Sequence, residues 1–224
     1  MAARGLNDQV INLILEDINQ GNYTGREISI LDLASGQGYN ASRLQKELIK
    51  LNYKFKITCV DIDSAQFRLT PDDNVLFFKG NLNTDLILGR FDFIVGTEII
   101  EHLENPYHFI NLCLSSLKTD GICYLTTPNV EHLFSLLKQA IFDRPMWFSV
   151  DEPSGHIMPI HGFMIDEALR RQEKNSGHRY LIKKSFNRNC WPLLVHNHHL
   201  SFITVPGKNR LFGEINIWRI YENT

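Results

Sequence analysis

Short apolar runs recur along the first part of the chain, and residues at helical spacing separate them. The runs, typical of buried strands, occupy residues 30–33, 55–60, 75–78, 91–96 and 122–127. Between them, apolar residues recurring every three to four positions predict helices over 39–53 and 109–117. Strands that alternate with helices in this way imply a parallel sheet with right-handed crossovers.

The remaining segments complete this picture at both ends of the chain. A helix is predicted over 6–20, as a cover for the sheet with at most a minor ligand role, and further helices over 131–142 and 166–174. Residues 180–186 and the alternating run 214–221 predict two more strands, the last as an antiparallel edge strand. We therefore expect an α/β fold with a doubly wound, mostly parallel seven-stranded sheet.

Composition narrows the class of protein. The chain has 224 residues and a net charge of −2, which suits one domain, and we take residues 1–224 as that domain. No apolar run approaches the ~20 residues of a membrane span, and the charge balance gives no general nucleic-acid footprint. Cys59 and Cys123 lie in predicted strands, where buried thiols indicate a reducing compartment, so we expect a cytoplasmic protein.

The segment from Asp32 to Gly38 joins the first of these strands to a helix through a glycine turn. Ligands of open α/β sheets bind at the carboxyl ends of strands, and glycine lets a ligand approach the backbone. The spacing from Gly36 to Ala41 permits a dinucleotide fingerprint, which leaves a nicotinamide oxidoreductase as one alternative. However, the carboxylate of Asp32 would repel a pyrophosphate and attract a cationic ligand.

Polar residues also follow the second and third strands. Asp61 ends the second strand, more than 20 residues after the glycine turn, where an acidic side chain can bind the hydroxyls of a ribose. Asp63 is interpreted as a helix cap. Asn81 follows the third strand, where its amide suits either the edge of an adenine or a surface turn.

A third polar group follows the fourth strand. Glu98, Glu101 and His102 share a face if this segment is helical, because they are spaced by three and four residues. Two carboxylates and an imidazole at a strand end can supply a general base or bind a divalent metal. The alternative is a solvated first helical turn, in which the carboxylates complement the helix dipole.

Taken together, the segments ILDLASGQG, VDID, GN, FDFIVGTEIIEHLENP and LKTDGICYLTTPN resemble a known family. They cover about residues 28–130, and their order and spacing are similar to those of class I S-adenosylmethionine (SAM)-dependent methyltransferases. The closest likeness is to the broad small-molecule, ubiquinone-type group with a Glu-His-Leu element after the fourth strand. The resemblance implies a Rossmann-like fold, a cofactor-binding core over 28–130, and a lid insertion with the substrate region over about 131–210.

The resemblance also implies SAM as cofactor and a role for each matching residue. Thr97 and Glu98 would lie near the sulfonium, and Asp61 would hold the ribose hydroxyls. Two positions depart from the family, which usually has Gly in place of Ala34 and Asp in place of Asn81. The implied cofactor-binding residues are Asp32, Ala34, Ser35, Gly36, Gly38, Asp61, Ile62, Asn81, Leu82 and Thr97.

The function expected from the resemblance is methyl transfer to a hydroxyl or other nucleophile of a small-molecule acceptor. His102 is the candidate general base, with Glu101 or Glu98 orienting it, and no metal is required. One alternative is a metal-dependent RNA 3′-end 2′-O-methyltransferase, whose ligand set would be Glu98, Glu101 and His102 with His156 or His161. Another alternative is a SAM-binding module without turnover. The oligomeric state is left open, a homodimer included.

The residues after 130 are the candidates for the acceptor pocket. Residues 144–163 form an irregular stretch that contains prolines, glycines and two histidines, which is typical of a functional lid. Trp147, Phe148 and Phe163 are candidate walls of the pocket. The histidines of the HNHH segment, 196–199, point to opposite faces if extended, so we expect a polar surface or pocket rim rather than a metal site.

Overall fold

The computed structural model describes residues 5–84, 89–148, 155–187, 189–196, 199–205 and 210–223, with the backbone alone in 189–205. The helices are α1 (Leu6–Gln20), α2 (Tyr39–Lys50), the 3-10 turn η1 (Ile100–His102), α3 (Pro106–Ser115), α4 (Leu133–Phe142) and α5 (Gly162–Ser176). The strands are β1 (Glu27–Leu33), β2 (Lys54–Asp61), β3 (Val75–Lys79), β4 (Phe91–Thr97), β5 (Leu117–Pro128), β6 (Arg179–Phe186), β7 (Asn189–His196), β8 (His199–Val205) and β9 (Ile215–Asn223).

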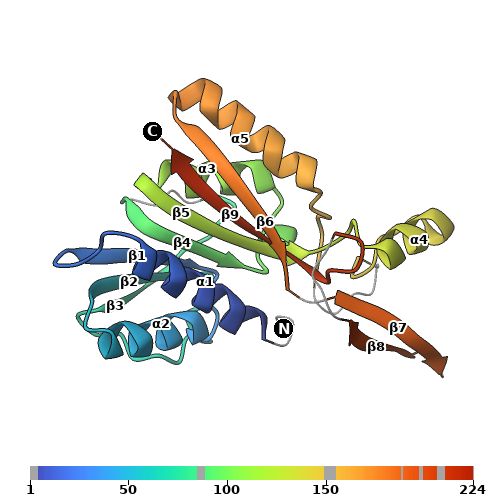
Figure 1. The fold of residues 1–224 in the computed structure, drawn as a ribbon, viewed down its shortest axis with the longest axis horizontal. Coiled ribbons are helices and arrows are strands. Elements are labelled where there is room, and N and C mark those ends of the chain that lie inside the picture. Colours follow the sequence, from blue (N-terminus) through green and yellow to red (C-terminus); the bar gives the residue numbers. More distant parts are fainter. Residues whose placement is uncertain are drawn as a thin grey trace.

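Seven of the described strands form one sheet in the order β3-β2-β1-β4-β5-β9-β6 (Figure 1). The first five are parallel, and β9 runs antiparallel to both of its neighbours, which confirms the expected fold class. The strand predicted over 214–221 is β9, and β6 lies outside it at the edge of the sheet. The chain order reverses between β1 and β4, and this switch point is where ligands of open α/β sheets bind.

Each face of the sheet is covered by a different pair of helices. Ile30 and Ile57 point toward α1 and α2, where they share an apolar cluster with Ile14 and Leu44. The alternate residue Leu31 points to the opposite face, which carries α3 and α5. This two-residue alternation buries the central strands on both faces. None of the helices in the described ranges has both the length and the apolar character needed to cross a membrane.

Two details differ from the sequence-based prediction. The fifth strand was predicted from residue 122, whereas β5 begins at Leu117 and includes Asp120, which adopts a left-handed φ of 62° beside a shift in the β4–β5 register. The β7–β8 hairpin was not predicted, and it lies with α4 beyond one end of the sheet (Figure 1). His196 and His199 pair across this hairpin, whereas His198 and the side chains of the HNHH segment lie outside the described residues.

Candidate functional site

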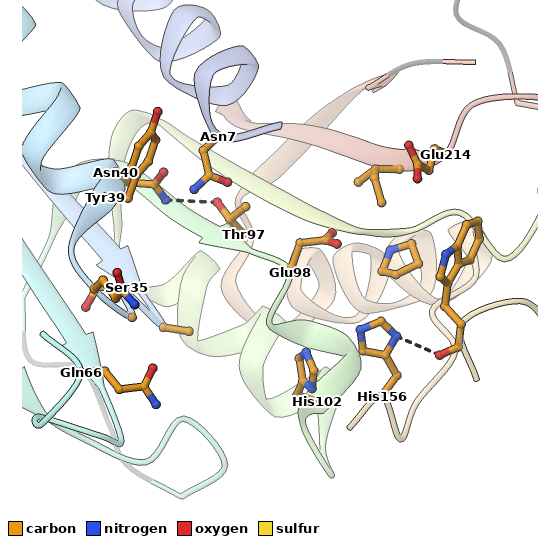
Figure 2. A pocket seen from close by; sticks show the side chains of 16 residues that line it. Asn7, Ser35, Tyr39, Asn40, Gln66, Thr97, Glu98, His102, His156 and Glu214 are labelled. Atoms are coloured by element: carbon orange, nitrogen blue, oxygen red, sulfur yellow. Dashed lines mark hydrogen bonds between the residues drawn. The ribbon is translucent and has the colours of Figure 1, made fainter. Parts of the chain in front are cut away.

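A cavity of about 860 Å³ opens at the carboxyl ends of β1 and β4, at the switch point of the sheet. Ala34, Ser35 and Gly36 line it from the turn after β1, and Thr97 and Glu98 line it from the end of β4. The same cavity continues to His102, Trp147 and His156 (Figure 2). Its volume lies in the range of small-molecule and cofactor pockets.

The turn after β1 keeps its backbone in left-handed conformations. Ala34, Gly36 and Gly38 have φ angles of 54°, 51° and 80°. A Cβ atom at Gly36 would point into open space, whereas one at Gly38 would lie 2.9 Å from the ring of Phe67. The turn therefore offers a bare backbone to the cavity at Gly36, and Gly38 is required for packing against the segment after β2.

Asp32 lies beneath this turn, with no exposed surface. The Asn40 amide donates to Asp32 Oδ1 at 3.4 Å and to Thr97 Oγ1 at 3.3 Å, so that one side chain of α2 connects the ends of β1 and β4. Asp32 Oδ2 has no hydrogen-bond partner among the described residues. Burial raises the pKa of Asp32 to about 7, although the hydrogen bond from Asn40 opposes this shift.

Asp61, at the end of β2, binds the glycine turn directly. Its Oδ2 accepts from the backbone N–H of Gly36 at 2.8 Å, and its Oδ1 accepts from the N–H of Asp63 at 2.9 Å. A carboxylate has about four lone-pair positions, so it can accept further hydrogen bonds from a ligand. The Asp63 carboxylate accepts from the N–H of Ala65, as a cap does.

Ile62, Asn81 and Leu82, three of the implied cofactor-binding residues, differ in their surroundings. Ile62 is 61% exposed beside Asp61, which leaves its side chain available to a flat ring. Asn81 Oδ1 accepts from the N–H of Asn83 and so stabilises the turn after β3. Leu82 is buried in the core on the α3 side of the sheet. These residues do not line the cavity described above.

Glu98, Glu101 and His102 come together without forming the regular helical face that their spacing suggests. Glu98 has a left-handed φ of 52°, and only Ile100–His102 form a single 3-10 turn. The backbone N–H of Glu98 donates to Thr126 Oγ1 at 3.0 Å, and the Thr126 hydroxyl donates to Glu98 Oε1 at 3.3 Å. Glu98 and His102 therefore face the cavity, whereas Glu101 is fully buried behind it.

The two carboxylates have raised pKa values. Burial raises the pKa of Glu98 well above its usual range, and the neighbouring charge of Glu101 adds to the shift. Burial also raises the pKa of Glu101 to about 7. Two acidic groups with perturbed pKa values beside a cavity are typical of functional sites.

The segment before α5 contributes the far wall of the cavity. His156 and Trp147 line it, and the ring of Phe148 lies 5.3 Å from that of His156. Phe163 is 66% exposed and does not line the cavity. His161 lies 3.9 Å from Glu131, so the histidine near Glu101 and His102 is His156, not the His161 of the predicted metal set.

Several cavity residues were missed in the sequence. Asn7 reaches the cavity from α1, and Glu214 reaches it from the start of β9 (Figure 2). No local pattern marks either residue, because each is brought there by the packing of a distant element. Asn40 had a detectable signal, since it is a polar residue on the helix face that also carries Ala41 and Leu44.

Comparisons with known proteins agree with this geometry. A sequence-family model described as a methyltransferase domain matches residues 4–216. A malonyl-[acyl-carrier protein] O-methyltransferase of Haemophilus influenzae is 29% identical over 47% of this chain and 40% of its own length. A ubiquinone biosynthesis O-methyltransferase of Rickettsia bellii is 26% identical over 53% of this chain and 50% of its own. The chain thus spans about half the length of the curated relatives it matches.

Among solved structures, a SAM-dependent methyltransferase from Archaeoglobus fulgidus has the same fold, with a TM-score of 0.60. The match covers 98% of this chain and 96% of that one at 18% identity. The family model extends over nearly the whole chain, so the chain belongs to this family of methyltransferase domains, as the sequence motifs indicated. The comparisons give no support to an RNA 3′-end enzyme, a binding module without turnover or a nicotinamide oxidoreductase.

S-adenosylmethionine is the cofactor of this class, and the residues present fit it. The orphaned oxygen of Asp32 lies close to the end of β1, where a ligand with positive charge would compensate the buried carboxylate. The missing Cβ at Gly36 leaves space for close approach, and Asp61 retains acceptor positions for a diol.

Proposed function

We propose that the protein transfers the methyl group of SAM to a hydroxyl, or to another nucleophile, of a small-molecule acceptor. The observation that carries this proposal is the continuity of the cavity. Ala34, Ser35 and Gly36 lie in one part of its wall, and His102, His156 and Trp147 lie in another. A cofactor held on the glycine turn and an acceptor held against the histidines would share one enclosed space.

The chain's own residues bind and orient the cofactor. Asp32, Ser35, Gly36 and Thr97 are the proposed contacts to its amino-acid part, Asp61 to its ribose, and Ile62 and Asn81 to its adenine. When bound, SAM supplies a methyl group on a positively charged sulfur that is a good leaving group. Most of the catalysis then comes from placing the acceptor in line with that methyl group.

His102 is the proposed general base for a hydroxyl acceptor. Its Nδ1 lies 3.1 Å from the carbonyl oxygen of Gly155, which can only accept, so Nδ1 carries the proton. The Nε2 lone pair is then available to take a proton from the acceptor. Glu101 precedes His102 in the same 3-10 turn and Glu98 lies on the cavity wall, so either carboxyl group, when ionised, would stabilise the imidazolium formed.

The size and lining of the cavity support a small acceptor. Trp147 and Pro128 offer apolar surface, whereas Glu98, Glu214 and the histidines offer polar contacts. The two curated relatives are named for methylation of oxygen on malonyl-acyl carrier protein and in ubiquinone biosynthesis, which supports an oxygen acceptor here. Cys59, Cys113 and Cys123 are buried free thiols, which supports a place in a reducing compartment such as the cytoplasm.

The proposal is tested by tracing the methyl group. Methyl-labelled SAM is incubated with the protein and cell extract, and the label is measured in small-molecule, lipid, protein and RNA fractions. We expect the label in the small-molecule fraction. Label in RNA, or SAM binding without label in any fraction, would contradict the proposal. A His102→Gln variant run in parallel separates transfer by this site from contaminating activity in the extract.

A further inference from the structure

One group of side chains beside the cavity has the composition of a metal site. Glu101 and His102 come from the 3-10 turn after β4, and His156 comes from the segment before α5. One potential ligand atom from each lies within 4.8 Å of the other two. Figure 2 shows the two imidazole rings next to each other below Glu98, and their centroids are 4.8 Å apart.

The orientation of both rings is fixed by backbone carbonyl groups. His102 Nδ1 lies 3.1 Å from the carbonyl oxygen of Gly155, and His156 Nδ1 lies 3.0 Å from that of Trp147. Because a carbonyl oxygen only accepts, each Nδ1 donates, and each Nε2 then holds a lone pair. Metal-binding histidines commonly have this arrangement, in which the second nitrogen donates to a carbonyl or carboxylate group.

Glu101 completes a set of electron-rich atoms. Its carboxylate is fully buried, and neither oxygen makes a hydrogen bond of normal geometry among the described residues, although the Thr127 hydroxyl is near enough to favour the ionised form. His156 Nε2 lies 3.9 Å from Glu101 Oε1, which is too long for a hydrogen bond. With both rings protonated at Nδ1, the buried carboxylate lies near the Nε2 lone pair of His156 and beside the ring of His102, and a cation among them would compensate its charge.

The backbone holds these elements together without help from the ligands. The N–H groups of Ile157 and Met158 both donate to the carbonyl oxygen of Glu101 at 3.0 Å. These bonds fix His156, the residue before Ile157, against the turn that carries Glu101 and His102. Ligand atoms that bind a cation at about 2.0–2.2 Å are roughly 3–4 Å from one another. Small side-chain rotations that move the ligand atoms by about 1 Å would therefore close the site.

We propose that Glu101, His102 and His156 bind a divalent transition-metal cation, with its open coordination positions toward the cavity. Two imidazoles and one carboxylate suit ions such as Zn²⁺, Mn²⁺, Fe²⁺ or Co²⁺. The proposed role of the cation is to hold an oxygen of the acceptor, and this role rests on the proposed function. The binding of the cation itself does not. Since ligation and general-base catalysis both need the Nε2 lone pair of His102, a bound cation takes the place of His102 as the group that activates the acceptor.

The test measures metal binding directly. Full-length protein is treated with a chelator, dialysed and titrated with Co²⁺, whose visible absorption reports ligation, while calorimetry gives the stoichiometry. We expect one ion per chain, and at least 10-fold weaker binding in Glu101→Gln and in His156→Gln. His161→Gln is the matched control, because His161 lies in the same segment but beside Glu131, and it should bind Co²⁺ like the wild type.

SAM binding is measured on every sample, so that a folding defect and a failure of either proposal can be distinguished. Variants that bind SAM normally are folded, and His102→Gln provides a third variant if a buried substitution at Glu101 unfolds the chain. Wild-type protein that binds SAM but no stoichiometric Co²⁺ would overturn the metal site and leave the proposed function intact. Equal Co²⁺ binding in wild type and in the folded ligand variants would also overturn it.

Discussion

The side-chain amide of Asn40 lies 3.4 Å from the buried carboxylate of Asp32 and donates to it at the point where the first strand meets its helix. The same amide also reaches Thr97 on the neighbouring strand. These contacts orient the Asp32 carboxylate but leave one of its oxygens without a partner among the described residues. We expect this unpartnered oxygen to favour a cationic cofactor, whose binding should then depend on pH.

Affinity for SAM should increase as the pH is raised from about 6 to about 8, because a cationic ligand favours the ionised form of Asp32. The pKa of this group is raised to about 7 in the free protein, so binding near or below that pH should release a proton. Calorimetry in two buffers of different ionisation enthalpy measures this release. The Asp32→Asn variant should bind SAM at least 10-fold more weakly, and a proton release that persisted in it would contradict the assignment.

Replacing Asp61 should weaken SAM binding more than replacing its neighbour Asp63. Hydrogen bonds to charged groups contribute about 1.5–3 kcal/mol, so Asp61→Asn should raise the dissociation constant roughly 10- to 100-fold. Asp63→Asn is the matched control, since Asp63 accepts from Ala65 and Gln66 and not from the glycine turn. Titration of both variants with SAM decides the matter, and equal effects would argue against the ribose-binding role.

Alanine should have different effects at the two glycines of the turn. Gly38→Ala should destabilise the fold by roughly 1–3 kcal/mol, because its φ is 80° and its Cβ would meet Phe67. Gly36→Ala should cost less stability, since Ala34 already adopts a similar φ and the space at Gly36 is open. It should instead obstruct the cofactor. Urea unfolding should show the larger loss of stability in Gly38→Ala, and SAM titration should show the weaker binding in Gly36→Ala. Similar losses of stability in both variants would refute the prediction.

His102→Gln should lower the rate of methyl transfer at least 100-fold while SAM affinity changes less than about twofold. The reason is that His102 faces the cavity at a distance from the residues proposed to hold the cofactor. The ring of His161 stacks on Phe163 outside the cavity, so the His161→Gln variant should keep the wild-type rate. Single-turnover kinetics with an identified acceptor provide the measurement. An unchanged rate in His102→Gln would remove this residue from the mechanism.

The regular part of the fold could be predicted because its strands are buried on both faces and its helices on one. Residues 30–33 and 91–96 are nearly continuous apolar runs, and residues 55–60 alternate apolar residues with Lys56 and Thr58, so each pattern favours a strand. The β7–β8 hairpin has a less regular pattern, with Pro192 inside β7 and a polar histidine where each strand meets the turn. A pattern of this kind does not distinguish a hairpin from a loop.

The proposed cofactor half of the site could be located for the same reason, since Asp32 lies near the end of one predicted strand and Asp61 directly follows another. The acceptor half could not. Glu98 departs from helical geometry with a φ of 52°, which no spacing rule anticipates. His156 and His161 are five residues apart in an irregular segment, so only the fold shows that His156 meets Glu101 and that His161 meets Glu131.

The carbonyl oxygen of Glu101 accepts from two consecutive N–H groups, at Ile157 and Met158. These bonds use main-chain atoms only, so they constrain the path of the chain but not the identity of the side chains along it. Substitutions at Trp147, which lines the cavity, can thus reshape the proposed acceptor wall without removing these main-chain bonds. For protein engineering, this makes the segment a natural site for libraries that change the acceptor while keeping the methyl donor.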